Sequence, residues 1–227
     1  MIDICRLSRD ARDRIGPHIR CTPLEPSVDL GRESGGSVFL KLENVQHTGS
    51  FKVRGALNRL LALDENEKSA GVVTASSGNH GMATAFGMNR LGIDGVIYLP
   101  ENASLLKVRA LESLGAEVRY YGSDCEATET HARRQAEQAG RVYISPYNDP
   151  LVVGGQGTIG LEILDRLPEV DCIMVSVGGG GLMSGIAGVA KAQRRGTRMV
   201  GCLPAQSPAM AESVRAGRIL DVPTGPT

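Results

Sequence analysis

One lysine stands where it could act as a chemical group instead of a solvated charge. Lys52 lies in the stretch 47–55, His-Thr-Gly-Ser-Phe-Lys-Val-Arg-Gly, where Ser50 can cap a helix that begins directly after it. An amine in the first helical turn lies near the positive end of the helix dipole, and burial would lower its pKa further. A neutral amine is what Schiff-base formation with an aldehyde cofactor requires. The alternative is an ordinary solvated lysine on a helix surface.

A run of four glycines offers a binding place for an anion. Residues 176–182 read Ser-Val-Gly-Gly-Gly-Gly-Leu and join an apolar strand to a helix. Glycines let the backbone turn sharply and direct several N–H groups toward one point beside a helix N-terminus, which suits a phosphate without basic side chains. The run lacks the Gly-Lys-Ser/Thr of a P-loop and the spacing of a dinucleotide-binding fingerprint. The alternative is a flexible turn between strand and helix.

Two further glycine-containing stretches are expected at strand-to-helix junctions. Residues 74–81, Thr-Ala-Ser-Ser-Gly-Asn-His-Gly, carry donors that suit a carboxylate, although ordinary helix capping uses the same residue types. His80 alone is interpreted as a structural histidine in the first turn of a helix. Residues 154–158, Gly-Gly-Gln-Gly-Thr, are interpreted as a structural junction before a helix that starts near residue 157. A lysine, a phosphate cradle and a carboxylate loop are together what pyridoxal 5′-phosphate (PLP) acting on an amino acid needs.

The elements that must position these groups alternate along the chain. Residues 71–144 predict four strands alternating with three helices, the pattern of a parallel sheet covered by helices, and the alternation continues over 157–216. We therefore predict an α/β protein with two lobes, each a mostly parallel sheet flanked by helices, and a ligand cleft between them. The large domain would comprise residues 1–70 and 149–227, with 71–148 as an inserted small α/β domain.

Composition excludes several classes of function. The 227 residues carry a formal net charge of zero, so neither nucleic acid nor an anionic membrane is expected as a partner. Five scattered cysteines without a Cys-x-x-Cys pair argue against a disulfide framework or a zinc site and favour a reducing compartment. The N-terminus is charged where a signal peptide would be apolar, and no apolar run reaches membrane-spanning length. We expect a cytoplasmic protein that acts on a small molecule.

Four motifs occur in the order and approximate spacing of one known family. They are Ser-Phe-Lys-Val-Arg-Gly-Ala at 50–56, Ser-Ser-Gly-Asn-His-Gly at 76–81, Gly-Gln-Gly-Thr at 155–158 and Gly-Gly-Gly-Gly-Leu at 178–182. Over nearly its whole length the chain resembles the fold-type II (tryptophan synthase β-like) PLP enzymes, within the serine/threonine dehydratase and serine racemase branch. The family is usually dimeric or tetrameric, so the resemblance implies a homodimer or homotetramer.

The resemblance implies a role for each matching residue. Lys52 is similar to the lysine that bonds the cofactor and later moves the α-proton, and Phe51 to the residue packed beside the pyridine ring. Asn79 matches the asparagine that hydrogen-bonds the cofactor's 3′-oxygen. The residues that match the phosphate cradle are Gly178, Gly179, Gly180, Gly181 and Leu182. The residues that match the loop gripping the substrate carboxylate are Ser76, Ser77, Gly78, Asn79 and His80. A serine at the position of Ser77 serves the opposite face of the cofactor in the racemase branch, which makes Ser77 a candidate catalytic residue.

Two departures limit what the resemblance implies. Relatives continue with a stretch that closes the large domain and supplies a Ser, Thr or Cys to the pyridine nitrogen, so the C-terminal part of that domain is expected to be missing here, and residues 222–227 predict a loop. Relatives with a divalent cation site carry acids where this chain has Leu203, Ser207 and Ala209. We therefore expect no metal site, or a much weakened one.

The expected activity is that of a PLP-dependent ammonia-lyase. It would convert a β-hydroxy amino acid such as L-threonine or L-serine to a 2-oxo acid and ammonia by β-elimination. Two alternatives stay open: a serine- or aspartate-type racemase on the same scaffold, and a non-catalytic, truncated protein that binds PLP. An NAD-dependent oxidoreductase would rest on the glycine run alone, and the spacing of that run disfavours it.

Overall fold

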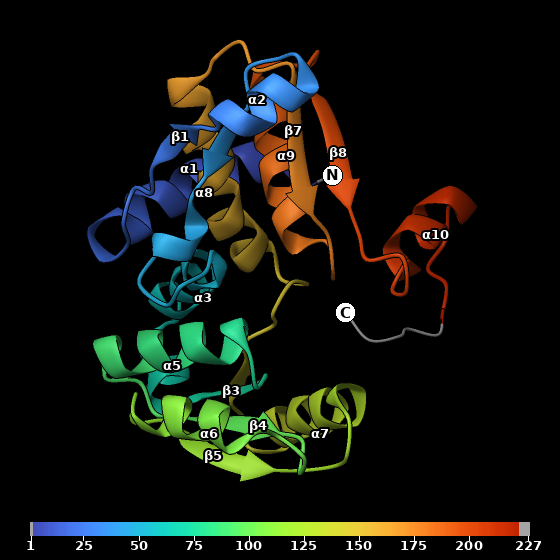
Figure 1. Cartoon of the computed structure of the whole chain (residues 1–227). Helices are drawn as coiled ribbons and strands as arrows, with labels where there is room; N and C mark the ends of the chain where they lie inside the picture. The colour runs from blue at the N-terminus through green and yellow to red at the C-terminus, as the bar shows by residue number, and fades with distance from the viewer. Residues whose placement is uncertain (1, 223–227) are drawn as a thin grey trace.

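The computed structural model describes residues 2–222, which fold into two lobes (Figure 1). Parallel strands flanked by helices occur in both lobes, so the predicted α/β fold class is confirmed. Helix α3 (Lys52–Leu61) lies between the lobes, where it packs against a helix of each. The domain boundaries at 70/71 and 148/149 stay a prediction, and residues 223–227 of the predicted C-terminal loop lie outside the described residues.

The smaller lobe is built on a four-stranded parallel sheet in the order β5-β4-β3-β6. Its strands and helices are β3 (Val72–Ala75), α5 (Asn79–Leu91), β4 (Gly95–Leu99), α6 (Leu105–Glu112), β5 (Glu117–Tyr120), α7 (Cys125–Gln138) and β6 (Val142–Tyr143). Successive residues of a strand face opposite sides of the sheet. Val96 and Tyr98 of β4 pack with α7, whereas Ile97 and Leu99 pack with α5 and α6.

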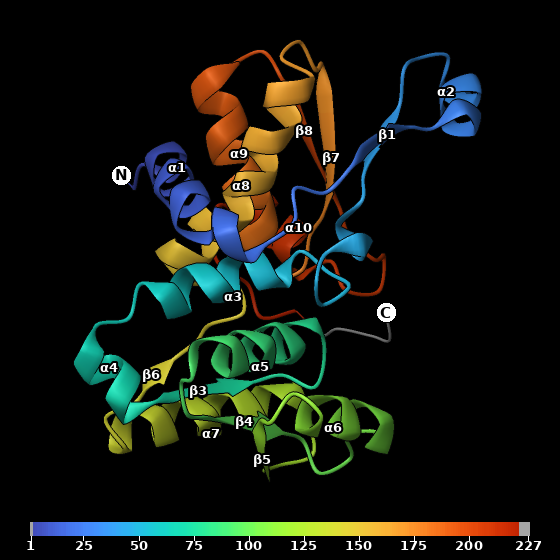
Figure 2. The ribbon, with the colours of Figure 1, turned by 90° about the vertical axis from the view of Figure 1, so that its left-hand side faces the viewer.

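The larger lobe is centred on helix α8, which packs against α1, α3 and α9 (Figure 2). Its helices, besides α3, are α1 (Ile4–Ile15), α2 (Val28–Ser34), α8 (Pro150–Arg166), α9 (Gly181–Gln193) and α10 (Ala209–Ala216), with short 3₁₀ turns η1 (Gly16–His18) and η2 (Glu43–Val45). The short helix α4 (Glu65–Ala70) follows α3 and lies beside β6 in Figure 2. No helix in the described range has both the length and the apolar character needed to cross a bilayer.

Helix α8 begins earlier than its glycines suggest. The predicted junction at 154–158 and the helix start near residue 157 are wrong, because the helix already begins at Pro150. The Asp149 carboxylate caps it by accepting from two backbone N–H groups at 2.7 and 3.1 Å, and proline is well suited to the first helical position. The glycines serve packing instead: a Cβ on Gly155 would lie 2.6 Å from the backbone oxygen of Arg54.

The strands of the larger lobe form two separate pairs in the described residues, not the single, mostly parallel sheet expected. β1 (Leu24–Pro26) and β2 (Phe39–Lys41) are antiparallel, and β7 (Cys172–Ser176) and β8 (Arg198–Cys202) are parallel. The short connection through α2 returns the chain directly beside β1, which produces an antiparallel pair, whereas α9 provides the crossover that a parallel pair needs. In Figure 2, β1 and α2 extend away from the helices of this lobe.

Candidate active site

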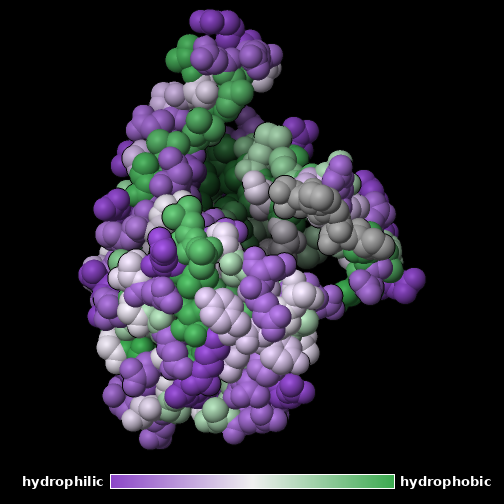
Figure 3. Space-filling view, turned by 60° about the horizontal axis from the view of Figure 1, so that its bottom comes forward, coloured by the Kyte–Doolittle hydropathy of each residue, from purple (hydrophilic) through white to green (hydrophobic). Residues whose placement is uncertain are grey.

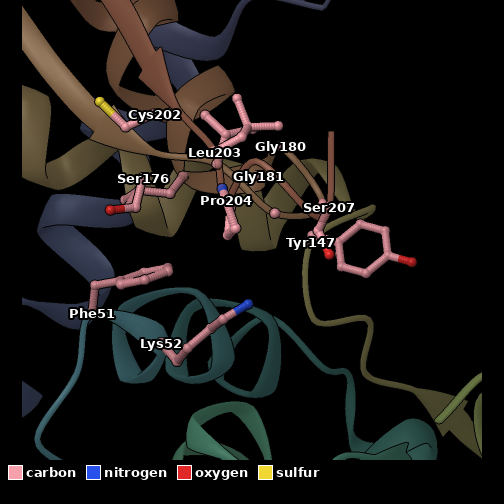
Figure 4. A pocket seen from close by; sticks show the side chains of 14 residues that line it. Phe51, Lys52, Tyr147, Ser176, Gly180, Gly181, Cys202, Leu203, Pro204 and Ser207 are labelled. Carbon is pink, nitrogen blue, oxygen red and sulfur yellow. The ribbon is translucent and has the colours of Figure 1, made fainter. Parts of the chain in front are cut away.

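A cavity of about 620 Å³ opens between the first turn of α3 and the loop that joins β7 to α9 (Figure 4). The face seen in Figure 3 is hollowed between the lobes, and hydrophobic residues are exposed in the hollow. The residues that line the cavity are Phe51, Lys52, Tyr147, Ser176, Val177, Gly178, Gly179, Gly180, Gly181, Leu182, Cys202, Leu203, Pro204 and Ser207. The structure thus brings together two predicted groups from distant parts of the chain, Phe51 with Lys52 and residues 178–182.

Lys52 is the first residue of α3, which confirms that it lies in the first helical turn. The prediction that Ser50 caps this helix is wrong. The chain turns at Gly49 (φ 70°), and Phe51, at the N-cap, already has helical backbone angles. As a result the hydroxyl of Ser50 makes no capping bond; it is buried without a hydrogen-bond partner among the described residues.

The amine of Lys52 points into the cavity and donates a hydrogen bond of 2.7 Å to the carbonyl oxygen of Pro146 (Figure 4). Its Nζ lies 5.4 Å from the centre of the Phe51 ring. Burial lowers the pKa of Lys52 from 10.5 to about 8, because the charged form loses hydration. At pH 7 roughly a tenth of such amines are neutral, whereas an unperturbed lysine would be neutral in fewer than about one molecule in a thousand. Lys52 is therefore suited to react as a nucleophile and a base.

The glycine loop owes its composition to its surroundings. Gly180 has a φ of 83°, a Cβ on Gly179 would lie 2.4 Å from the ring of Tyr147, and one on Gly181 would lie 2.8 Å from the backbone oxygen of Tyr147. Helix α9 begins at Gly181 with no side-chain cap among the described residues. The first N–H groups of a helix have no acceptor within it, and together with the helix dipole they favour an anion. This end of the cavity suits a phosphate.

The stretch Ser76–His80 lies at the junction of β3 and α5, as predicted, but none of its residues lines the cavity. Asn79 is the first residue of α5. His80 is buried, and its Nε2 lies 3.0 Å from the carbonyl oxygen of Ile144. Burial, opposed by this hydrogen bond and reinforced by the charge of Lys52, lowers the pKa of His80 to about 3. His80 is therefore neutral at physiological pH, in keeping with its interpretation as a structural residue.

Sequence reasoning missed several walls of the cavity. Tyr147, Cys202 and Pro204 line it without belonging to any of the motifs. Cys202 and Pro204 lie at and just after the carboxyl end of β8, where ligands bind in parallel α/β sheets, and that rule was the available signal. Tyr147 follows the last strand of the small lobe and has no local signal of its own. Leu203 and Ser207, two of the three positions expected to lack cation ligands, also line the cavity.

Residues 2–222 contain no group of three or more His, Cys, Asp or Glu side chains that could hold a metal ion. The absence of a working cation site stays a prediction, because it concerns the behaviour of the protein in the presence of metal.

Fold and cavity together define a class of protein. A partly buried lysine with a lowered pKa faces a glycine loop at a helix N-terminus, and this pair of groups fits a small phosphorylated aldehyde. The sequence pattern of the family described as "Pyridoxal-phosphate dependent enzyme" matches residues 15–227, and the chain belongs to that family. The cofactor of the family is PLP. Phe51, Lys52 and the loop 178–182 provide an amine, an aromatic wall and an anion cradle that fit it.

Individual relatives carry two different activities in their names. The chain is 40% identical over 219 residues to L-threonine ammonia-lyase of Thermotoga maritima, an alignment that covers 96% of this chain and 55% of the relative. It is 38% identical over 216 residues to serine racemase of Oryza sativa subsp. indica, covering 95% and 64%. Among solved structures, maize serine racemase superposes with a TM-score of 0.93 at 37% identity, covering 98% of this chain and 68% of that one. The chain therefore spans little more than half to about two thirds of the length of these relatives.

Proposed function

We propose that the chain forms the catalytic site of a PLP-dependent ammonia-lyase. The substrate would be a β-hydroxy amino acid such as L-threonine or L-serine, and the products a 2-oxo acid and ammonia. The observation that carries this proposal is the position of Lys52, whose partly buried amine, with a pKa of about 8, faces the anion-binding loop across one cavity. Substrate and reaction are proposals, since named relatives of similar identity include lyases and racemases.

Each part of the site has a proposed task toward the cofactor. When bound, PLP supplies an aldehyde that condenses with amines and a ring that delocalises the electrons left after loss of an α-proton. Lys52 would hold the cofactor through its amine. The N–H groups of Gly178 to Gly181 and Leu182 would bind its phosphate, and Phe51 would provide an apolar wall for its ring. Asn79 is proposed to hydrogen-bond its 3′-oxygen.

The proton balance of Lys52 suits the elimination. Once the substrate amine has displaced it, Lys52 is a free amine that can take the α-proton from the substrate carbon. The neighbouring His80 is neutral at physiological pH and does not compete as a cation for the substrate carboxylate. Donors of the stretch Ser76–His80, at the N-terminus of α5, are proposed to bind that carboxylate. The β-hydroxyl would take up one proton, in balance with the α-proton held by Lys52, and leave as water; hydrolysis of the resulting enamine would then release the 2-oxo acid and ammonia.

A racemase is the second candidate, supported by the serine racemases among the relatives. Racemisation needs an acid–base group on the face opposite Lys52, a role proposed for Ser77. β-Elimination needs no such group. This difference favours the lyase.

The test is product analysis on the PLP-loaded protein with L-threonine, L-serine and 3-hydroxyaspartate. Keto acid and ammonia in equal amounts are the expected products, without accumulation of the D-amino acid. Lys52→Ala should abolish both turnover and the absorbance that appears when a lysine bonds PLP, and the exposed Lys107→Ala serves as its control.

Three outcomes discriminate between the candidates. D-amino acid as the main product would assign the racemase. PLP bonded at Lys52 without either product would favour a non-catalytic binding protein. Turnover in the Lys52→Ala variant would refute the role of Lys52.

A further inference from the structure

Two residues beyond Lys52, helix α3 carries a buried cluster of charges. Arg54 is 0% exposed and holds two carboxylates, each through two hydrogen bonds. Its Nε and Nη2 donate to Glu43 at 2.8 Å each, and its Nη1 and Nη2 donate to Glu162 at 2.6 and 3.0 Å. The amine of Lys41 contacts Glu162 as well and donates to the carbonyl oxygen of Thr22 at 2.6 Å. The cluster therefore balances two cations against two anions.

The cluster joins parts of the chain that are far apart in sequence. Lys41 ends β2, Glu43 begins η2, and Glu162 lies on α8. Burial alone would raise the pKa of Glu162, but the hydrogen bonds and charges of Arg54 and Lys41 outweigh it, and the pKa is lowered. Arg54 also donates to Thr158 of α8 at 3.1 Å. Only the planar, five-donor fork of arginine can bond two carboxylates in this way.

The start of α3 depends on these contacts because it lacks an ordinary cap. No side chain caps it among the described residues, and the Ser50 hydroxyl beside it is unbonded. The first turn is instead fixed from within, at Arg54 and at its neighbour Gly55. A Cβ on Gly55 would lie 2.8 Å from the backbone oxygen of Val152 in α8. Lys52 shares this turn, so its direction follows from how the turn is held.

Stability alone does not account for such a cluster. Ion pairs buried in this way are often replaceable by apolar residues of similar volume without loss of stability, because each charge must be stripped of water. Apolar packing does not fix the orientation of a helical turn as closely as the paired hydrogen bonds between an arginine and two carboxylates do. The geometry points to Arg54, held between Glu43 and Glu162, as a positioning residue that keeps the Lys52 amine partly buried at its place in the cavity. This inference rests on the proposed function only in that Lys52 is the group being positioned.

The pKa of Lys52 in the cofactor-free chain reports this positioning directly. It can be measured by competitive acetylation with acetic anhydride over a pH series, with mass spectrometry of the Lys52 peptide. The titratable groups around Lys52 are His80 on α5, and Tyr147 and Cys202 on the cavity wall. None of them is altered in the test variants, Arg54→Lys and Glu162→Gln.

Both variants should raise the pKa of Lys52 by about one unit or more toward that of a solvated lysine, because the loosened first turn admits water. Attachment of added PLP at pH 7 should then slow about tenfold, in step with the smaller neutral fraction. For Glu162→Gln the sign is decisive. Loss of a negative charge acts through space to lower the pKa of a nearby amine, so an increase can come only from relaxed burial. The matched control is Arg59→Lys on the same helix, whose ion pairs with Glu67 and Asp149 span 3.4 Å each and whose side chain is 15% exposed; it should leave the pKa unchanged.

A merely structural role has a different signature. If Arg54→Lys and Glu162→Gln lower the melting temperature but leave the pKa of Lys52 and the PLP attachment rate as in the wild type, the inference is overturned. Glu162→Gln keeps the size and one acceptor oxygen of the side chain, so it carries the test should Arg54→Lys not fold. A wild-type protein whose Lys52 titrates near pH 8 but never bonds PLP would refute the proposed function and leave the positioning measurable by acetylation.

Discussion

Replacing Lys52 with methionine should stabilise the cofactor-free protein at neutral pH. The pKa of Lys52 is about 8 in the folded state, against 10.5 for the unperturbed side chain. Between these values the unfolded chain binds more protons than the folded one, so the free energy of unfolding rises with pH across this window. Below pH 8 the folded protein bears the whole free-energy cost of burying the charged amine. The difference between these two pKa values corresponds to about 3.4 kcal/mol.

The hydrogen bond from Lys52 to the Pro146 carbonyl at 2.7 Å opposes this gain, and its loss costs about 1–2 kcal/mol. Lys52→Met should therefore be more stable than the wild type by about 1–2 kcal/mol at pH 7. At pH 10.5 the wild-type amine is neutral in the folded state and about half neutral in the unfolded state, so little of the cost of burial remains and the hydrogen bond is kept. The order should then reverse, with the wild type more stable by about 1–2 kcal/mol.

Urea unfolding of the cofactor-free proteins between pH 7 and 10.5, followed by circular dichroism, measures both differences. Lys107→Met, which replaces an exposed lysine on α6, is the matched control and should show no such crossing. A difference between wild type and Lys52→Met that stays constant from pH 7 to 10.5 would mean that Lys52 is solvated in the folded protein. That result would refute the reasoning from burial to nucleophile.

Three further predictions concern other parts of the molecule. Gly155→Ala should destabilise the protein by about 1–3 kcal/mol in urea unfolding, because its Cβ would meet the backbone of α3 at 2.6 Å; Gly196→Ala, in open space, should change stability by less than about 0.5 kcal/mol. Since the pKa of His80 is lowered to about 3, the folded state resists its protonation, and stability present above pH 6.5 should fall by about 2 kcal/mol by pH 5. His80→Gln should lose this acid sensitivity, and an equal decline in both proteins would contradict it. Divalent cations at micromolar concentration should leave PLP affinity unchanged in an absorbance titration; tighter binding would show that a cation site exists.

Local sequence signals were enough for much of the fold. The alternation of apolar strands and amphipathic helices over residues 71–144 predicted the four strands and three helices of the smaller lobe, because strand and helix periods are properties of neighbouring residues. The glycine run 178–181 was recognisable as a strand-to-helix loop for the same reason. The start of α8 was predicted wrongly, because the glycines at 154–157 suggested a junction and the capping signal of Asp149 and Pro150 was overlooked. Those glycines allow neighbouring helices to pack closely against α8, and the local sequence does not reveal which helices those are.

The sequence by itself determined which chemical groups are present, namely an amine at Lys52 and an anion-binding loop at residues 178–182. It also indicated the family to which the chain belongs. Only the tertiary structure decided that these groups share one cavity, that Tyr147 completes its wall, and that Lys52 is buried enough for its pKa to fall to about 8. The charge cluster around Arg54 was also decided only by the tertiary structure, because its members come from β2, η2 and α8. Burial and pairing depend on which distant segments meet, and that is a property of the folded chain as a whole.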